Sequence, residues 1–137
     1  MIIESIQNGI VIDHIAPGRA MQLYSMLKLD QLDCGLAIIQ KVNSRKMGKK
    51  DVIKIAAETE LDFDVIGYLS PEATVNIIKD GKIVEKKFIA PPARLVNIVR
   101  CKNPRCITTT EQEIAHIFVQ IKQGEYRCLY CDTKISQ

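Results

Sequence analysis

Four cysteines near the C-terminal end constrain the fold of this chain more than any other feature. They fall as two pairs, Cys101-x4-Cys106 and Cys128-x2-Cys131, with 21 residues between the pairs. Two tight loops that each offer a pair of thiolates can place four sulfurs at the corners of a tetrahedron, which is the geometry that a structural zinc ion prefers. Gly124 allows the chain to reverse before the second pair. The spacing therefore predicts a four-cysteine zinc site.

The cysteines leave alternatives open. Iron in the same four-sulfur cage is the main competitor, and two disulfides or four unrelated buried thiols are the others. Zinc is favoured because a short tail with few large apolar residues needs a cross-link to fold. A site with four protein ligands has no position for an activated water, so the metal is expected to be structural. The fifth cysteine, Cys34, lies in an apolar run and is expected to be an inert core residue.

The chain is predicted to form two domains, residues 1–92 and 93–137. It has 137 residues, and Ala90-Pro91-Pro92-Ala93 interrupts the hydrophobic pattern as a stiff linker. The sequence does not begin with a basic segment followed by a long apolar run, and no apolar run approaches the ~20 residues needed to span a bilayer. We expect a cytoplasmic protein without a membrane partner, whose thiols stay reduced and available for metal.

The charge balance argues against a nucleic-acid partner. A net charge of +3 is only mildly basic, and with 5% aromatic residues and no Trp there is little material for a base-stacking face. A zinc-ribbon nucleic-acid-binding protein remains the alternative function. A thiol redox enzyme that uses Cys128-x2-Cys131 is a second rival, and it requires an accessible thiolate of low pKa. The lysines would suit a small polyanionic ligand if they converge.

Hydrophobic periodicity predicts an α+β first domain. Segments 61–69 and 19–30 have helical spacing, and Asp80-Gly81 is a strong hairpin signal. Segment 114–121 fits either a helix or a strand, and we predict a strand because Gly124 follows at hairpin distance. The order predicts an antiparallel sheet with both helices on one face. The expected strands of the first domain are 2–6, 10–15, 34–42, 51–56, 74–78 and 82–89.

Several polar residues on these strands are candidates for a binding site. Asp13 and His14 are adjacent, so they face opposite ways unless they lie at a strand end. Lys50 and Lys54 share one face of their strand, and Lys82, Val84 and Lys86 are expected to do the same. A solvated surface is the simpler explanation of such lysine rows. If the sheet brings Asp13, Lys54 and Lys86 together, the lysines can bind phosphates and the carboxylate can accept hydrogen bonds from ribose hydroxyls.

The residues do not support a catalytic function. His14 and His116 are the only histidines, and no Ser-His-Asp ordering is present. A glycine-rich phosphate-binding loop of either common type is also absent from the sequence. A bound nucleotide would therefore be held by side chains and strand backbone, which is consistent with reversible occupancy.

Nearly the whole length of the chain resembles the regulatory chains of aspartate carbamoyltransferase. The resemblance rests on Gly9-Ile-Val-Ile-Asp-His-Ile15, Met47-Gly-Lys-Lys-Asp-Val-Ile-Lys-Ile55, Pro71-Glu-Ala-Thr-Val-Asn76 and the four cysteines with Tyr130. It implies a non-catalytic subunit of pyrimidine biosynthesis, with an N-terminal allosteric domain of ferredoxin-like form and a small C-terminal zinc-binding β domain. Regulatory homodimers of that family bridge catalytic trimers and bind ATP, CTP and UTP as effectors, and Mg²⁺ can accompany the nucleotide.

The resemblance also implies roles for individual residues. Asp13 and Lys54 would hold the ribose, Lys86 and His14 would meet the phosphates with Lys50 near them, and Asn76 would line the pocket. An aromatic position of the family's last hairpin falls at Gly81 here, which bears on how the base packs. Arg105 stands where the family has an asparagine. The base edge would be read by the backbone of Ile3, Ser5 and Ile6, and the catalytic chain would be contacted near Asn103, Tyr130 and Asp132.

Overall fold

The computed structural model describes residues 6–136, so the expected strand at 2–6 lies almost entirely outside the described residues. The chain divides into two compact units, Met1–Ala90 and Pro91–Gln137, and each is described here by itself. Among the described residues, no helix has the length and apolar character required to cross a membrane.

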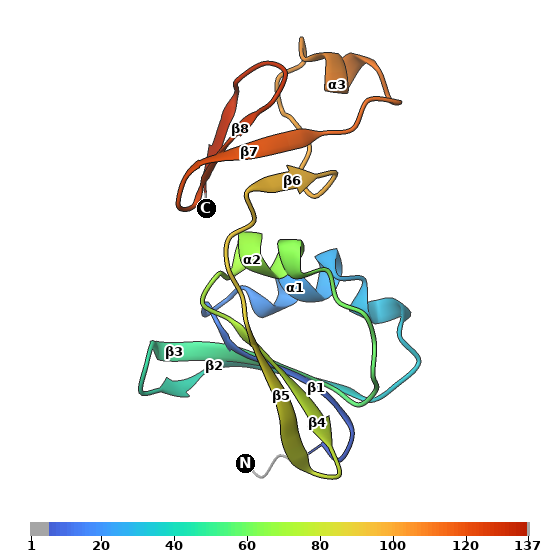
Figure 1. The fold of residues 1–137 in the computed structure, drawn as a ribbon, viewed down its shortest axis with the longest axis vertical. Helices are drawn as coiled ribbons and strands as arrows, with labels where there is room; N and C mark the ends of the chain where they lie inside the picture. The colour runs from blue at the N-terminus through green and yellow to red at the C-terminus, as the bar shows by residue number, and fades with distance from the viewer. Residues whose placement is uncertain (1–5, 137) are drawn as a thin grey trace. The chain divides into compact units, whose positions relative to one another are not determined.

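The first unit is a five-stranded antiparallel sheet with helices on one side (Figure 1). Neighbouring strands follow the order β2-β3-β1-β4-β5, and the first four alternate with the helices in the β-α-β-β-α-β sequence of ferredoxin-like folds. The predicted α+β class, with two helices on one face, is confirmed. The elements are β1 (Gly9–Ile15), α1 (Ala20–Met26), the 3-10 turn η1 (Leu29–Gln31), β2 (Leu36–Ser44), β3 (Gly48–Ile55), α2 (Phe63–Leu69), β4 (Thr74–Lys79) and β5 (Lys82–Phe88).

The core of the first unit lies between the sheet and the helices. Alternate residues of the central strands point toward the helices, since side chains change face at every step along a strand. The helix α1 ends earlier than its periodicity predicts because Lys28 adopts a left-handed conformation with φ of 56°. Asp62 caps α2 by accepting hydrogen bonds from the backbone of Asp64 and Val65. The fully buried core side chains are Ile12, Ile15, Leu23, Ile53, Ile55 and Ile66.

The hairpin between β4 and β5 turns at Asp80-Gly81, as predicted. Both residues have positive φ, 51° and 75°, which matches the right-handed twist of the flanking strands. The pairing then skips one residue, because Ile77 pairs with Glu85 but Ile78 pairs with Ile83. This bulge at Val84 reverses the alternation, so Lys82 does not share a face with Lys86. The expectation that Lys82, Val84 and Lys86 project together is therefore wrong.

The second unit is a small four-stranded antiparallel sheet in the order β6-β7-β8-β9. The strand predicted across 114–121 is confirmed as β7, and Gly124 occupies the β7–β8 turn with φ of 80°. Its core is formed by Leu95, Phe118 and Tyr126, all nearly inaccessible to solvent. Its elements are β6 (Arg94–Val96), the short helix α3 (Ile107–Thr110), β7 (Ile117–Lys122), β8 (Glu125–Cys128) and β9 (Lys134–Ser136).

Candidate ligand pocket and metal centre

The four cysteines of the second unit converge on one point. Their Sγ atoms all lie within 4.8 Å of one another, and none forms a disulfide. Two of these separations join the two loops, at 3.5 Å from Cys101 to Cys131 and 3.7 Å from Cys106 to Cys128. Sulfurs bound tetrahedrally to zinc at ~2.3 Å would lie roughly 3.8 Å apart. The donor set and its spacing therefore fit a closed structural metal site.

Backbone hydrogen bonds hold the first cysteine loop in shape. The Asn103 carbonyl accepts from Cys106 N–H at 3.1 Å, and the Asn103 side chain accepts from Arg105 N–H at 3.0 Å. His116, to which the sequence assigned no role, accepts the Cys101 N–H at its Nδ1 at 3.0 Å. Its own N–H donates to Asn97 at 2.9 Å. These contacts fix the loop from outside the metal cage.

Two threonine hydroxyls contact the sulfurs. Thr108 lies 3.0 Å from Sγ of Cys106, and Thr133 lies 3.1 Å from Sγ of Cys131. The hydroxyl of Thr133 lowers the pKa of Cys131 to about 6, and that of Thr108 lowers the pKa of Cys106. Burial raises the pKa of Cys101 to about 12. Hydroxyl donors of this kind stabilise thiolates, which are the form that binds metal.

The sheet of the first unit carries a cavity of about 500 Å³ on the face turned away from the helices. Its walls are the alternate residues of β1 and β3 that the core does not use, joined by residues of β2, β4 and the hairpin. Both apolar and charged side chains line the cavity. The sequence analysis predicted the charged side chains but not the apolar ones. The lining residues are Ile6, Val11, Asp13, Ile39, Val42, Lys50, Val52, Lys54, Asn76, Ile78, Gly81 and Ile83.

Strand register arranges the pocket in cross-strand rows. One row places Lys54, Val11, Asn76 and Lys86 directly opposite one another on four successive strands. Two residues along, about 6.6 Å away, the next row joins Asp13, Thr74 and Phe88. On the other side, Gly9, Ile78 and Ile83 form an apolar row. The pocket face is thus apolar in the row nearest the hairpin turn, and its charged side chains lie among apolar ones in the rows beyond it.

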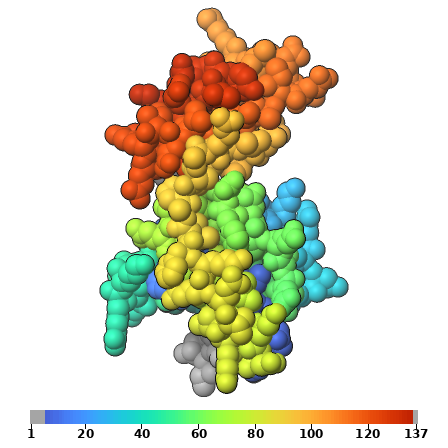
Figure 2. All heavy atoms as spheres, in the orientation of Figure 1, coloured from blue at the N-terminus to red at the C-terminus, as the bar shows by residue number. Residues whose placement is uncertain are grey.

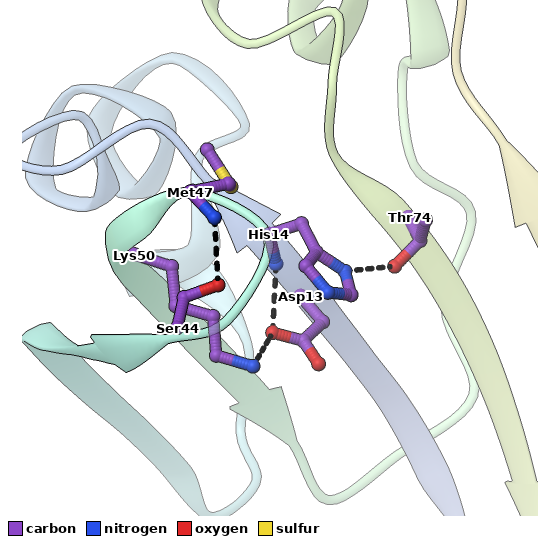
Figure 3. A network of polar contacts seen from close by, with 6 residues as sticks. All are labelled: Asp13, His14, Ser44, Met47, Lys50 and Thr74. Carbon is purple, nitrogen blue, oxygen red and sulfur yellow. Dashed lines mark hydrogen bonds and ion pairs between the residues drawn. The ribbon is translucent and has the colours of Figure 1, made fainter.

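A bulge in β1 shapes the charged end. Asp13 and His14 together face the single residue Val52 of β3, and His14 takes a φ of 56°. The irregularity lets both side chains serve one face, where strict alternation would separate them. Figure 3 shows the Nδ1 of His14 directed at the Thr74 hydroxyl, 3.1 Å away. The backbone therefore places both side chains on one face of the sheet.

Asp13 accepts hydrogen bonds from two of the residues drawn in Figure 3, Lys50 and His14. Its Oδ1 accepts from the Lys50 ammonium at 2.9 Å and from the His14 N–H at 2.7 Å. Partial burial opposes ionisation of this carboxyl, but the hydrogen bonds from Lys50 and His14 outweigh burial and lower its pKa. The Asp13 carboxylate therefore stays ionised at neutral pH, and the side chain of Lys50 is already oriented into the cavity.

One polar atom in the pocket lacks a partner. Among the residues that the structure describes, Oδ1 of Asn76 is buried and accepts no hydrogen bond. Leaving such an acceptor unpaired costs roughly 1–3 kcal/mol, so a ligand donor at this point would recover that energy. Lys86, opposite Asn76, lies with its ammonium 5.7 Å from the ring centre of the exposed Phe88. Figure 2 shows β5, in yellow, at the surface of the first unit.

Most predicted ligand-site residues of the first unit meet at this pocket. Asp13, Lys50, Lys54, Asn76 and Ile6 line the cavity directly. His14 joins them through Asp13 and Thr74, and Lys86 through its register with Asn76. Ile3 and Ser5 lie outside the described residues.

The three residues expected at a partner interface lie in, or directly after, the two cysteine loops. Asn103 lies between the first two cysteines, and Tyr130 lies between the last two with 46% of its surface exposed. Asp132 follows the last cysteine with φ of 63° and forms an ion pair with Arg127. They are thus placed by the same two loops that present the sulfurs.

The fold and the two sites define a protein with an α+β unit that carries a partly charged pocket and a β unit that carries a four-cysteine cluster suited to a metal. Two family models match the chain: the allosteric domain of the aspartate carbamoyltransferase regulatory chain over residues 1–90, and its metal-binding domain over residues 93–137. The regulatory chain of Clostridium tetani is 46% identical over 135 residues, covering 96% of this chain and 94% of that protein. The regulatory chain of Bifidobacterium longum is 43% identical over 134 residues, covering 96% of each.

This chain belongs to the family of aspartate carbamoyltransferase regulatory chains. It is a regulatory, non-catalytic subunit with an allosteric domain and a metal-binding domain. Family membership favours a regulatory chain over the two other functions considered, a zinc-ribbon nucleic-acid-binding protein and a thiol redox enzyme.

Proposed function

We propose that the cavity of the first unit binds the nucleoside triphosphates ATP, CTP and UTP as allosteric effectors. The observation that carries this proposal is the mixed apolar and charged pocket face. Its apolar row suits a base, and the two rows beyond it, with Lys50 and His14 beside them, together offer hydrogen-bonding groups for a ribose and cations for phosphates. A nucleotide carries an apolar base at one end and charged phosphates at the other, so it matches this arrangement. A simple anion has no part that would occupy the apolar row.

Individual residues of these rows then have separate roles in nucleotide binding. The base packs against Ile78 and Ile83 and is read by the backbone at Ile6, together with Ile3 and Ser5. Asp13 and Lys54 hold the ribose, and the unpaired Oδ1 of Asn76 accepts a hydrogen bond from the nucleotide. The phosphates meet Lys86, His14 and Lys50, and Mg²⁺ can accompany them.

In the second unit, the four thiolates would hold one structural zinc ion. Its chemistry there is to cross-link the two loops and thereby fix the surface that carries Asn103, Tyr130 and Asp132. That surface would dock on the catalytic chain of aspartate carbamoyltransferase. Four cysteines kept as thiolates require a reducing compartment, which supports a cytoplasmic location.

Regulatory chains would pair as homodimers and bridge catalytic trimers in the assembled enzyme. Within the described part of the first unit, β2 and β5 are the edges of the sheet, and an edge strand is a natural site for pairing with another copy. Effectors would act by binding one quaternary state more tightly than the other, because a ligand with equal affinity for both shifts neither. Couplings of about 1–3 kcal/mol are enough for several-fold changes in activity.

The test is calorimetric titration of the metal-loaded chain with ATP, CTP and UTP. Lys86→Ala should weaken binding about tenfold or more, because it removes a charge-assisted contact to phosphate. Lys87→Ala is the matched control, since Lys87 lies on the opposite face against the ring of Phe63, 5.1 Å from its centre. Lys82→Ala is a second control, because the bulge turns Lys82 away from the Lys86 face. Equal losses in all three variants would refute the assignment of the pocket.

A further inference from the structure

We propose that Asp51 is a positioning residue for the effector pocket, although its side chain lies on the opposite side of the sheet from that pocket. Asp51 sits in β3 between Lys50 and Val52, which line the cavity. Side chains alternate along a strand, so its carboxylate points under α1. It is completely inaccessible to solvent. The inference rests on the proposed nucleotide-binding function of that pocket.

The carboxylate accepts three backbone hydrogen bonds. Its Oδ2 accepts from Gly18 N–H at 2.9 Å and from Ala20 N–H at 3.0 Å, and its Oδ1 accepts from Lys41 N–H at 2.8 Å. The first two donors lie where the chain leaves β1 and enters α1, a helix whose N-cap residue Arg19 makes no side-chain cap. The third lies in β2. One side chain therefore ties β2 to the segment that leads from β1 into α1.

Those strands are irregular at the level of Asp51. In β2, Gln40 and Lys41 face Asp51 alone, and Lys41 has φ of 58°. In β1, the Asp13-His14 bulge lies immediately before the pairing of Ile15 with Asp51. Bulges interrupt the regular ladder and leave backbone groups without strand partners. The Asp51 carboxylate accepts the Lys41 N–H that the β2 bulge withdraws from the ladder, and it fixes the chain downstream of the β1 bulge.

The two bulges determine the shape of the charged end of the pocket. The bulge in β1 gives His14 and Asp13 a common face, and the bulge in β2 sets the register that places Val42 opposite Lys50. Lys54 differs, because it pairs in regular ladder with Val11 and Ala37, before either bulge. Loss of the carboxylate should therefore displace His14 above all, because His14 lies in the bulge itself, while leaving Lys54 in place.

Asp51→Asn tests this with almost no change of volume. The amide keeps one acceptor oxygen but turns an NH₂ group toward backbone N–H donors, so at least one donor loses its partner. The experiment measures dissociation constants of ATP and CTP for the full, metal-loaded chain. Asp51→Asn is introduced into three backgrounds: the unmodified chain, the His14→Ala variant and the Lys54→Ala variant. Amide hydrogen exchange of each variant establishes that the first unit remains folded.

A positioning role predicts a specific pattern of coupling. Asp51→Asn should raise both dissociation constants about tenfold in the unmodified chain and in the Lys54→Ala background, but at most about twofold in the His14→Ala background. A general loosening of the unit would instead give the same factor in all three backgrounds. That result would overturn the inference and leave the proposed function standing.

Two other outcomes are also decisive. If the unmodified chain bound neither nucleotide, the proposed function would fail and the inference with it. If Asp51→Asn did not fold, Asp51→Glu enters the same three backgrounds, since it keeps the charge but moves the oxygens by one methylene. The same coupling to His14 is expected there, and equal factors in every background would again overturn the positioning role.

Discussion

The two units of this chain reach a folded state by different means. The first buries a continuous apolar layer, including Ile12, Ile53 and Ile66, between a five-stranded sheet and two helices. The second buries few large side chains beyond Leu95, Phe118 and Tyr126, and it brings four thiols into one cluster instead. A small unit with so little core depends on a cross-link for stability. The unit with the ligand pocket can therefore remain folded under conditions that unfold the unit that would dock.

Metal removal should separate the two units most clearly. Structural zinc contributes roughly 10–16 kcal/mol of apparent folding free energy in small zinc domains at neutral pH. A strong chelator should unfold residues 93–137 and abolish association with the catalytic chain, while residues 6–90 keep their protection. Hydrogen exchange read separately for each unit, with elemental analysis of the metal, measures this and also distinguishes zinc from iron.

The cysteines supply the matched control for that experiment. Cys128→Ser should reproduce the effect of the chelator, because it removes one of four ligands. Cys34→Ser should leave metal content unchanged, because Cys34 lies in the first unit, apart from the cage. Assembly with the catalytic chain after complete metal loss would contradict the proposed dependence of docking on zinc.

Core truncation should show the opposite preference. Ile12→Ala removes a side chain with no solvent exposure and should destabilise the first unit by about 2–5 kcal/mol. Metal binding by the second unit should be unaffected. Val84→Ala, at the exposed bulge of β5, removes apolar atoms from the same sheet and should cost less than about 0.5 kcal/mol. Urea unfolding monitored by hydrogen exchange gives both values, and loss of metal from the Ile12 variant would break the comparison.

The sequence predicted the elements of both units better than the details of the pocket. The cysteine spacing and Gly124 were sufficient for the metal cluster and the strand Ile117–Lys122, because four ligands of one metal must converge whatever the path between them. The Asp80-Gly81 turn was predictable for a similar local reason. Short strands such as β6 and β9 carry too few residues for a periodic signal.

Bulges in β1, β2 and β5 explain why the sequence did not predict which side chains share the pocket face. Period-two reasoning placed Lys82 with Lys86, and the bulge at Val84 separated them. The same reasoning left the relation of Asp13 to His14 open, and a bulge decided it. A bulge depends on hydrogen bonds from distant residues such as Asp51, so local sequence does not encode it visibly.

The threonines near the sulfurs should tune the metal centre by a smaller amount. Thr133→Ala removes the hydroxyl 3.1 Å from Sγ of Cys131 and should weaken metal affinity about 10–100-fold, the usual effect of losing a hydrogen bond to a metal ligand. Thr110→Ala is the control, because its hydroxyl contacts only the Ile107 carbonyl. Competition with a coloured chelator measures both affinities. Equal affinities of the two variants would show that the hydroxyl does not stabilise the thiolate.

The smallest effect is expected from the Asp13–Lys50 ion pair of the first unit. The hydrogen bonds to Asp13 lower its pKa below the ordinary value of 3.8, so the stabilisation they provide is complete above that pH and disappears as the pH falls through the folded-state pKa. Asp13→Asn should therefore cost about 0.5–1 kcal/mol at pH 7, a modest value because the pair is partly exposed to solvent. The difference from the unmodified chain should shrink as the pH falls below 3.8.

Acid should affect the second unit earlier, which provides an internal reference for that titration. Its thiols ionise in ordinary surroundings near 9.0, so protons compete with the metal well above the range in which Asp13 titrates. Lys122→Ala, which breaks the exposed Lys122–Glu125 pair of the second unit, should change stability by almost nothing at any pH. Hydrogen exchange of both units between pH 7 and pH 3 tests which unit loses stability first. A gap between Asp13→Asn and the unmodified chain that stayed constant to pH 3 would mean that the carboxylate acts by packing and not by its charge.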